Sequence, residues 1–558
     1  MLACVGRPKF HEYESPRPRM DVFDYIIVGA GTAGCVLAAR LSESANRSVL
    51  VLEAGGSDLR FWVRVPIGYG RTFNDPRVNW MYQSEPEPAL SGRRGFWPRG
   101  KVLGGSGSIN DMIYIRGFPC DFDGWQACGN PGWGWQEVLP YFRKIEDYPR
   151  GAAEYRARGG PIHITDMADG AHPLCRTFIE SCRRLGYRVL DDFNAAPLEG
   201  VGVYQITTRD GMRMSTARGY LRPALRRANL RLLLRAHALR VLFAGRRASG
   251  VAFRHRGRTL EARARRAVIL SLGSVNSPQL LQLSGIGDSD LLRRHGIEVV
   301  AHSPQVGRNL QDHLDVSYVY RSRVPTLNDE FYPLAGKLRA GLRYLLTRSG
   351  PLSMSINQCG GFLRSDPGQP HPNLQIVCSP VSYDPLTWPM RRLLKPHPFS
   401  GFVVSFQSCR PTSRGRIEIR SADPFAPPLI FPNYLSSEHD LAEIPAGARL
   451  LRRIAATAPL SDVIETELEP GAGTATDAEL LQDFRDRAVT VYHPVGTCGM
   501  GPDPATSVVD ARLRVHGVAG LRVIDASIFP AVTSGNTNTP TTMVAEKAAD
   551  LIREEEGG

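Results

Sequence analysis

The sequence contains no long apolar run, no paired cysteine motif and no segment that resembles a signal peptide. A membrane-spanning helix needs about 18 or more apolar residues in a row, and no stretch of this chain approaches that length. The ten cysteines include neither a CxxC pair nor a His–Cys spacing typical of zinc ligands, which predicts reduced thiols and no metal site. A secretory signal peptide has a charged region, then an apolar region, then small residues at a cleavage site, and the sequence shows no such segment. We therefore expect a cytoplasmic protein, with peripheral association with the inner membrane as an alternative.

Lysine is also scarce, so the formal net charge of +13 comes almost entirely from arginine. The densest arginine groups lie at 222–240 and 254–266, and no stacking aromatic residues are interleaved with them. Nucleic-acid binding is therefore not expected, because single strands are bound by cations combined with aromatic platforms. A chain of 558 residues is too long to fold around a single hydrophobic core, and its length favours two to four domains.

The chain does contain a nucleotide-binding βαβ pattern near its start. The apolar run 25–28 is typical of a buried parallel strand, and the glycine-rich turn 29–34 lets the backbone approach a pyrophosphate. A helix expected over 33–41 directs its N-terminal dipole at the phosphates. Glu53 ends the second strand about 20 residues farther on, where it can accept a hydrogen bond from a ribose 2′-hydroxyl. The pattern predicts a dinucleotide site.

Sequence character divides the chain into a discontinuous nucleotide domain and a second domain that covers the reactive face of the cofactor. Residues 1–19 are polar, aperiodic and rich in proline, and are expected to be a disordered extension. The nucleotide domain is expected to comprise 20–160, 200–315 and 485–556, and the substrate domain 161–199 and 316–484.

Apolar periodicity predicts strands and helices in both domains. Helices are expected at 277–283 and 445–456, each with a proline in its first turn, where proline is tolerated. Strands are expected at 230–234, 240–243, 267–272, 402–406 and 415–419.

Three further motifs join the nucleotide pattern: the glycine-serine loop 99–110, the segment 273–287, and a C-terminal pair, 492–501 and 523–527, that leads to 535–541. Together they resemble the glucose-methanol-choline (GMC) oxidoreductases, flavoproteins that oxidise alcohols. The resemblance covers 21–555, and within the family it is greatest to bacterial choline dehydrogenase-like and alkane-pathway alcohol dehydrogenases. It implies an α/β FAD-binding Rossmann-like domain and an α+β substrate domain with an antiparallel sheet.

The resemblance implies FAD as the cofactor. Some relatives bind the flavin covalently through a histidine of the glycine-serine loop, and Ile109 stands at that place here, which implies non-covalent FAD. The glycines of the turn and Glu53 would hold the ADP half, and Val241 would lie near the adenine. The residues implied to contact FAD are Gly29, Gly31, Thr32, Ala33, Gly34, Glu53, Ala54, Arg99, Gly104, Gly105, Ser106, Asn110, Val241, Asp525, Ala526, Asn536 and Thr537.

Alcohol oxidation requires a base that removes the hydroxyl proton while the carbon-bound hydrogen leaves as hydride to flavin N5. Histidine, with its pKa near neutrality, is the natural candidate. His493 precedes a compact Pro-Val-Gly-Thr turn and matches the family's base. Asn536 matches the second active-site position, where an amide can orient the substrate oxygen but cannot take a proton.

The substrate pocket is expected to include Gln358 and Tyr492. In the choline enzymes a carboxylate precedes the Gly-Gly-Phe of the substrate domain, whereas Gln358 precedes Cys359 and 360–362 here. Loss of that charge favours neutral alcohols over choline. Asp111 is a second departure from the family pattern. Its carboxylate either lies near the flavin and alters the flavin's reduction potential, or points into solvent.

The expected function is thus FAD-dependent oxidation of an aliphatic or aromatic primary alcohol to the aldehyde, with oxygen or a quinone as electron acceptor. The alternative is use of the fold without net oxidation, as in hydroxynitrile lyases or fatty-acid photodecarboxylases. The decarboxylases lack a histidine at the place of His493 and carry an arginine where this chain has 374–377. Both differences favour the redox reading.

Overall fold

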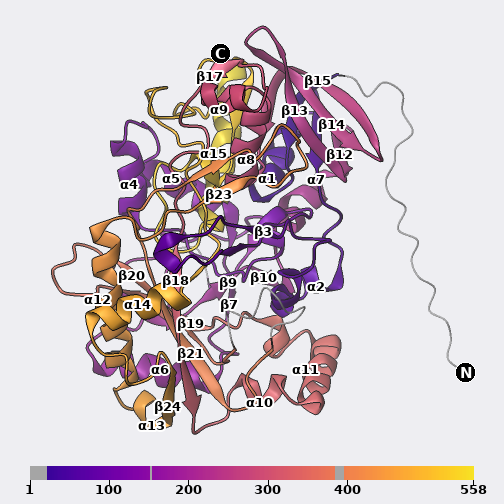
Figure 1. Cartoon of the computed structure of the whole chain (residues 1–558). Coiled ribbons are helices and arrows are strands. Elements are labelled where there is room, and N and C mark those ends of the chain that lie inside the picture. Colours follow the sequence, from indigo (N-terminus) through magenta and orange to yellow (C-terminus); the bar gives the residue numbers. More distant parts are fainter. Residues whose placement is uncertain (1–21, 151–153, 384–394, 558) are drawn as a thin grey trace, which may run out of the picture.

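A computed structural model describes residues 22–150, 154–383 and 395–557, and Figure 1 shows two sheets at opposite ends of the view. The predicted disordered extension, 1–19, lies outside the described residues. The architecture confirms the expected fold class, an α/β nucleotide domain joined to an α+β domain with an antiparallel sheet.

The sheet of the nucleotide domain has a parallel core and an antiparallel extension. Its apolar strands are buried on both faces, which explains their continuous Val, Ile and Leu runs. The parallel strands are, in spatial order, β12 (Leu230–Leu234), β2 (Val49–Glu53), β1 (Val22–Val28), β15 (Arg258–Leu270) and β26 (Leu521–Val523). The first half of β15 pairs antiparallel with β14 (Arg247–His255), which pairs with β13 (Ala236–Ala244).

The second sheet is antiparallel, and its cavity-side residues come from its central strands. The spatial order is β24 (Ile464–Glu469), β18 (Leu314–Ser322), β21 (Gly401–Ser408), β20 (Leu374–Ser379), β19 (Cys359–Leu363) and β8 (Gly200–Val203). The short strand β25 (Val489–Thr490) also pairs with β18. Thus β8 and β25, both expected in the nucleotide domain, belong to the second sheet. Both strands lie within a few residues of the boundaries proposed from the sequence, at 200 and 485.

Two helices begin earlier than predicted, and each carries its proline in the interior. Helix α8 spans Gly273–Leu283 and α12 spans Glu438–Ala455, with Pro278 and Pro445 inside them. Pro278 cannot donate to the carbonyl of Ser274 one turn earlier. The hydroxyl of Thr497 donates to that carbonyl instead, at 2.7 Å, so the freed acceptor is satisfied from outside the helix.

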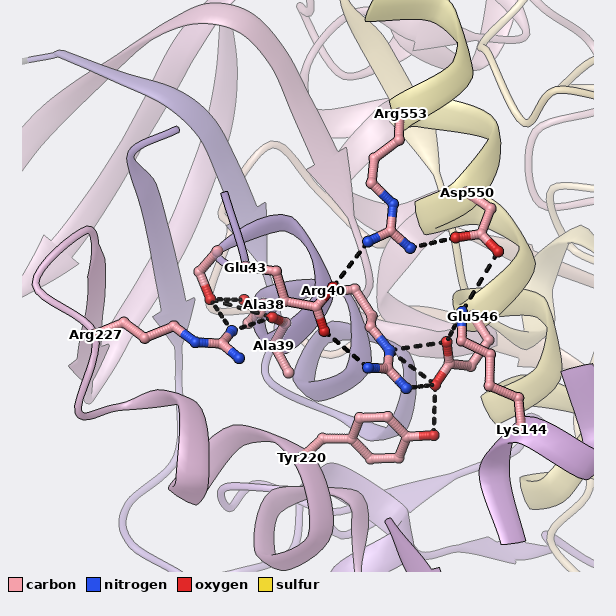
Figure 2. Close-up of polar contacts among 11 residues, drawn as sticks. Ala38, Ala39, Arg40, Glu43, Lys144, Tyr220, Arg227, Glu546, Asp550 and Arg553 are labelled. Carbon is pink, nitrogen blue, oxygen red and sulfur yellow. Dashed lines mark hydrogen bonds and ion pairs between the residues drawn. The ribbon is translucent and has the colours of Figure 1, made fainter. Parts of the chain in front are cut away.

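The two ends of the described chain are held together by a buried ionic cluster around Glu546, the Glu546 cluster (Figure 2). Helix α1 (Thr32–Leu41) supplies Arg40, whose guanidinium donates to the Glu546 carboxylate of α15 (Asn538–Gly557) at 2.8 to 3.1 Å. The hydroxyl of Tyr220 donates at 2.7 Å and Lys144 of α5 (Trp135–Ile145) lies at 3.0 Å. This cluster holds the middle of α15 against α1, and at the start of α15 the hydroxyl of Thr32 donates to the side-chain oxygen of Asn538 at 2.7 Å.

Candidate functional site

A cavity of about 660 Å³ is lined by residues from both sheets. The carboxyl ends of β1 and β2 and the turns that follow them form one wall, and residues of β18, β20 and β21 form another. Ligands of open parallel sheets bind outside the carboxyl ends of the strands. The cavity therefore lies where the sequence placed a dinucleotide.

The turn after β1 needs its glycines for steric reasons. Gly29 has φ +96°, and a Cβ there would lie 2.5 Å from the carbonyl oxygen of Ser271. A Cβ on Gly34 would lie 1.9 Å from the carbonyl oxygen of Gly29, so α1 approaches the turn as closely as backbone allows. The cavity wall at this point is bare main chain.

The glycine-serine loop packs directly on that turn. The N–H of Gly104 donates to the carbonyl of Ala30 at 2.7 Å, and a Cβ on Gly105 would lie 2.7 Å from the Cα of Gly31. Gly105 has φ +56°, a left-handed conformation that glycine adopts without strain. Two glycine backbones thus meet at the floor of the cavity.

Two buried carboxylates order the main chain of this wall. Both oxygens of Glu53 accept backbone hydrogen bonds, from Ala30 at 2.9 Å and Gly55 at 2.7 Å. Burial raises the pKa of Glu53 to about 7, against the opposing effect of these bonds. Asp525 accepts from the N–H of Gly273 at 2.9 Å and from the hydroxyl of Ser277 at 2.6 Å, which fixes the start of α8.

Most residues implied to contact the cofactor line this one cavity, although they come from four separate parts of the chain. Those at the lining are Gly29, Gly31, Thr32, Ala33, Glu53, Ala54, Arg99, Gly105, Ser106, Asn110, Asp525, Ala526, Asn536 and Thr537, together with Ile109, Tyr492 and His493. Gly34 and Gly104 lie behind the lining as packing positions.

Two placements differ from the sequence analysis. Val241 is buried inside β13 and does not line the cavity, which is bordered instead by Ala236 to Ala238 of the same strand. Gln358 is also buried behind the wall, where its side-chain oxygen accepts the N–H of His172 at 2.8 Å. Its neighbour Asn357 lines the cavity. The predicted role of Gln358 in excluding choline therefore has no structural basis.

A chain of hydrogen bonds, the histidine cluster, crosses the cavity wall from Cys409 to Asn536. The carbonyl of Cys409 can only accept, so Nε2 of His313, 3.0 Å away, carries a proton. Burial lowers the pKa of His313 to about 4, so its Nδ1 is an unprotonated acceptor at neutral pH. Nδ1 of His493 lies 3.0 Å from that acceptor and therefore donates to it.

The same chain fixes the protonation of the second nitrogen of His493. Burial lowers the pKa of His493 well below its ordinary value, assisted by His313 and Arg99, so the ring is neutral. With its proton on Nδ1, the ring presents Nε2 as a lone pair. The amide nitrogen of Asn536 donates to Nε2 at 3.1 Å, which agrees with this tautomer. The backbone N–H of His493 donates to Asp312 at 2.8 Å and holds the ring in place.

The sequence analysis noted Asp111 but missed His313 and three residues that line the cavity, Asp315, Asn357 and Tyr383. Asp111 lies at the cavity and accepts from the amide of Asn357 at 2.9 Å. Burial raises the pKa of Asp315 to about 7, and burial together with Asp315 and Asp111 raises the pKa of Tyr383. The sequence feature that could have revealed His313 is the polar run 311–313, which lies immediately before a strand and so places three polar side chains at a strand end.

The cavity fits FAD on two structural observations. The Gly29–Gly31 turn and the glycine-serine loop leave main chain where any Cβ would collide, as a pyrophosphate cradle requires. The side-chain oxygen of Asn536 is buried without a hydrogen-bond partner among the described residues, at the same lining as His493.

Comparison with known proteins agrees with this geometry. GMC oxidoreductase family models match residues 23–315 and 411–545. The chain is 42% identical over 543 residues to the mitochondrial choline dehydrogenase of Mus musculus, covering 96% of this chain and 90% of the relative. It is 41% identical over 540 residues to the alcohol dehydrogenase [acceptor] of Pseudomonas putida, covering 95% and 96%.

Among solved structures, a pyridoxine 4-oxidase matches with a TM-score of 0.86 and 31% identity, covering 95% of this chain and 99% of that one. The family models together span most of the described residues, and the relatives extend along almost the whole chain. The chain therefore belongs to the GMC oxidoreductase family, as an FAD-dependent enzyme that acts on CH–OH donors.

Proposed function

We propose that the protein oxidises primary alcohols to aldehydes and that His493 removes the hydroxyl proton. The observation that carries this proposal is the histidine cluster, because it leaves Nε2 of His493 unprotonated at the cavity. The amide nitrogen of Asn536 can hydrogen-bond the alcohol oxygen while Nε2 takes the proton. FAD, when bound, supplies the acceptor for the carbon-bound hydrogen as hydride.

A cation-bearing alcohol such as choline is a second candidate substrate beside neutral alcohols. Asp111 and Asp315 line the cavity, and both influence Tyr383, which lines it as well. A quaternary ammonium gains from a nearby carboxylate and from aromatic faces. The side chain that argued against choline, Gln358, is outside the cavity.

The test is anaerobic bleaching of the flavin's visible absorption by choline, butanol, octanol and benzyl alcohol. The proposal expects at least one of them to reduce the flavin in a single turnover and yield its aldehyde. Admission of oxygen, or of a soluble quinone, then identifies the electron acceptor by the rate of reoxidation. Failure of every primary alcohol to bleach a fully FAD-loaded enzyme would contradict the proposal.

A further inference from the structure

Helix α11 (Leu334–Thr347) carries a stripe of leucines that faces solvent. The exposed fractions are 72% for Leu334, 66% for Leu338, 59% for Leu342, 58% for Leu345 and 74% for Leu346. Among the described residues, the other exposed apolar side chains, such as Leu468 in β24 at 39%, do not form a row of this length on one helix. Figure 1 shows α11 at the periphery of the molecule, at the lower right.

The opposite face of α11 fixes the direction of this stripe. At 3.6 residues per turn the five leucines fall within an arc of about 120°, and the buried residues Gly336, Ala340 and Tyr344 lie on the other side. The hydroxyl of Tyr344 donates to the carbonyl of Gly211 at 2.9 Å, which anchors the helix to the body of the protein. The leucines therefore point directly away from the protein.

Cationic side chains border the stripe on both sides. By the same helical geometry, Lys337 lies at one edge of the leucine arc, and Arg339 and Arg343 lie at the other. All three are exposed, Arg348 follows at the end of the helix, and α11 contains no acidic residue. An apolar face bordered by Lys and Arg is the pattern of helices that lie in the plane of a membrane surface.

The length of α11 excludes a spanning role. Its 14 residues extend about 21 Å, which is shorter than the hydrocarbon core of about 30 Å. Across the described ranges, none of the helices has the length and apolar character needed to cross a bilayer.

We propose that α11 is a membrane-docking helix, which inserts its five leucines into the surface of a bilayer that contains anionic phospholipid. The cationic side chains on both edges of the leucine stripe would lie at the level of the lipid headgroups, where they can pair with anionic phosphates. From α11 the chain leads through the short helix η5 (Pro351–Ser353) to Ile356 and Asn357, which line the cavity. The proposal concerns a surface and does not depend on the proposed reaction.

The test is sedimentation of the full-length, FAD-loaded enzyme with vesicles of phosphatidylcholine and phosphatidylglycerol. The variant Leu338→Gln/Leu342→Gln/Leu346→Gln should bind about 10-fold or more weakly, because three buried apolar side chains are lost. Leu468→Gln is the matched control and should bind as the wild type does. Lys337→Gln/Arg339→Gln/Arg343→Gln should weaken binding to anionic vesicles and reduce its salt dependence.

Activity with a soluble acceptor and the unfolding temperature should be unchanged in these variants, which separates docking from folding. Two results would overturn the proposal: wild-type protein that stays in solution with anionic vesicles, or a leucine variant that binds them equally well. A concentration-dependent dimer that the leucine variant abolishes, without vesicle binding, would instead assign α11 to an interface between two copies of this chain.

Discussion

The Glu546 cluster and the histidine cluster are both buried and polar, yet their electrostatics are opposite. Around Glu546, whose side chain is fully buried, the cations Arg40 and Lys144 meet one carboxylate at hydrogen-bond distances. In the histidine cluster, burial lowers the pKa of both His313 and His493, so both rings are neutral. The Glu546 cluster joins helices through charged side chains. The histidine cluster is a chain of hydrogen bonds between neutral groups that reaches Nε2 of His493 at the cavity.

The electrostatic difference fits a structural role for the Glu546 cluster and the proposed catalytic role for the histidine cluster. A buried charge is tolerated only when it is paired, so the Glu546 cluster has no lone pair to offer a substrate. The histidine cluster contains only neutral rings. Its last acceptor at the cavity is Nε2 of His493, which receives a hydrogen bond from the neutral amide of Asn536. Substitutions in the first cluster should therefore change stability, and those in the second should change rate.

The largest expected effect is that of His493→Gln on flavin reduction. Glutamine keeps a hydrogen-bonding amide near Asn536 but provides no base, so the rate constant should fall by about 100- to 10,000-fold. FAD content and unfolding temperature should remain those of the wild type. Stopped-flow absorbance under anaerobic conditions measures the rate. A wild-type rate in this variant would move the base to another residue.

Breaking the other cluster should change stability with little effect on rate. Glu546→Gln leaves Arg40 and Lys144 without their buried counter-charge, which costs about 3 to 5 kcal/mol of the free energy of unfolding. Glu43→Gln is the matched control, because Glu43 pairs with the same Arg40 at the surface. Denaturant unfolding of the two FAD-loaded variants compares them. Equal destabilisation by both would contradict the role given to Glu546.

A substitution at Glu53 tests whether one carboxylate both orders the main chain of the turn and contributes to FAD binding. Glu53→Gln removes one charge-assisted acceptor at the turn, and such bonds contribute about 1.5 to 3 kcal/mol, so FAD should bind about 10- to 100-fold more weakly. The recovery of flavin fluorescence on dilution measures the dissociation constant. An unchanged constant would show that Glu53 supports only the main chain.

A smaller effect is expected for His313, which acts on the reaction through His493. His313→Phe removes the acceptor for Nδ1 of His493, and loss of one hydrogen bond of about 1.5 kcal/mol lowers the reduction rate about 10-fold. His313→Asn should restore much of the rate, because its amide can accept from the same N–H. Identical pH profiles in the wild type and the Phe variant would leave His313 with a packing role alone.

The sequence predicted those parts of the fold and site that depend on local constraints. The glycines of the turn and Glu53 belong to one βαβ unit of about 30 residues, so their spacing reveals their role. The starts of α8 and α12 were misplaced because distant partners, such as Thr497 for the carbonyl of Ser274, allow a proline inside a helix. Such distant partners cannot be predicted from the local sequence.

The polar residues of the site show the same limit. His313 meets His493 only because β18 and the segment after β25 lie side by side, a pairing that no short-range pattern encodes. Gln358 was assigned to the pocket by its place beside a motif, yet its buried side chain accepts from His172, and Asn357 lines the cavity instead. Family resemblance pointed to His493 as the proposed base, and the fold was needed to identify His313 as its hydrogen-bond partner.

The central claim, that a neutral His493 presents Nε2 as the base, is tested most directly by the pH dependence of the flavin reduction rate. The folded-state pKa of His493 is lowered from its ordinary value of 6.5, so the ring stays neutral to more acidic pH. The rate should hold constant down to pH values below 6.5, then fall as Nε2 is protonated, and His493→Gln should lack this transition. A transition above 6.5, or one that persists in His493→Gln, would contradict the account.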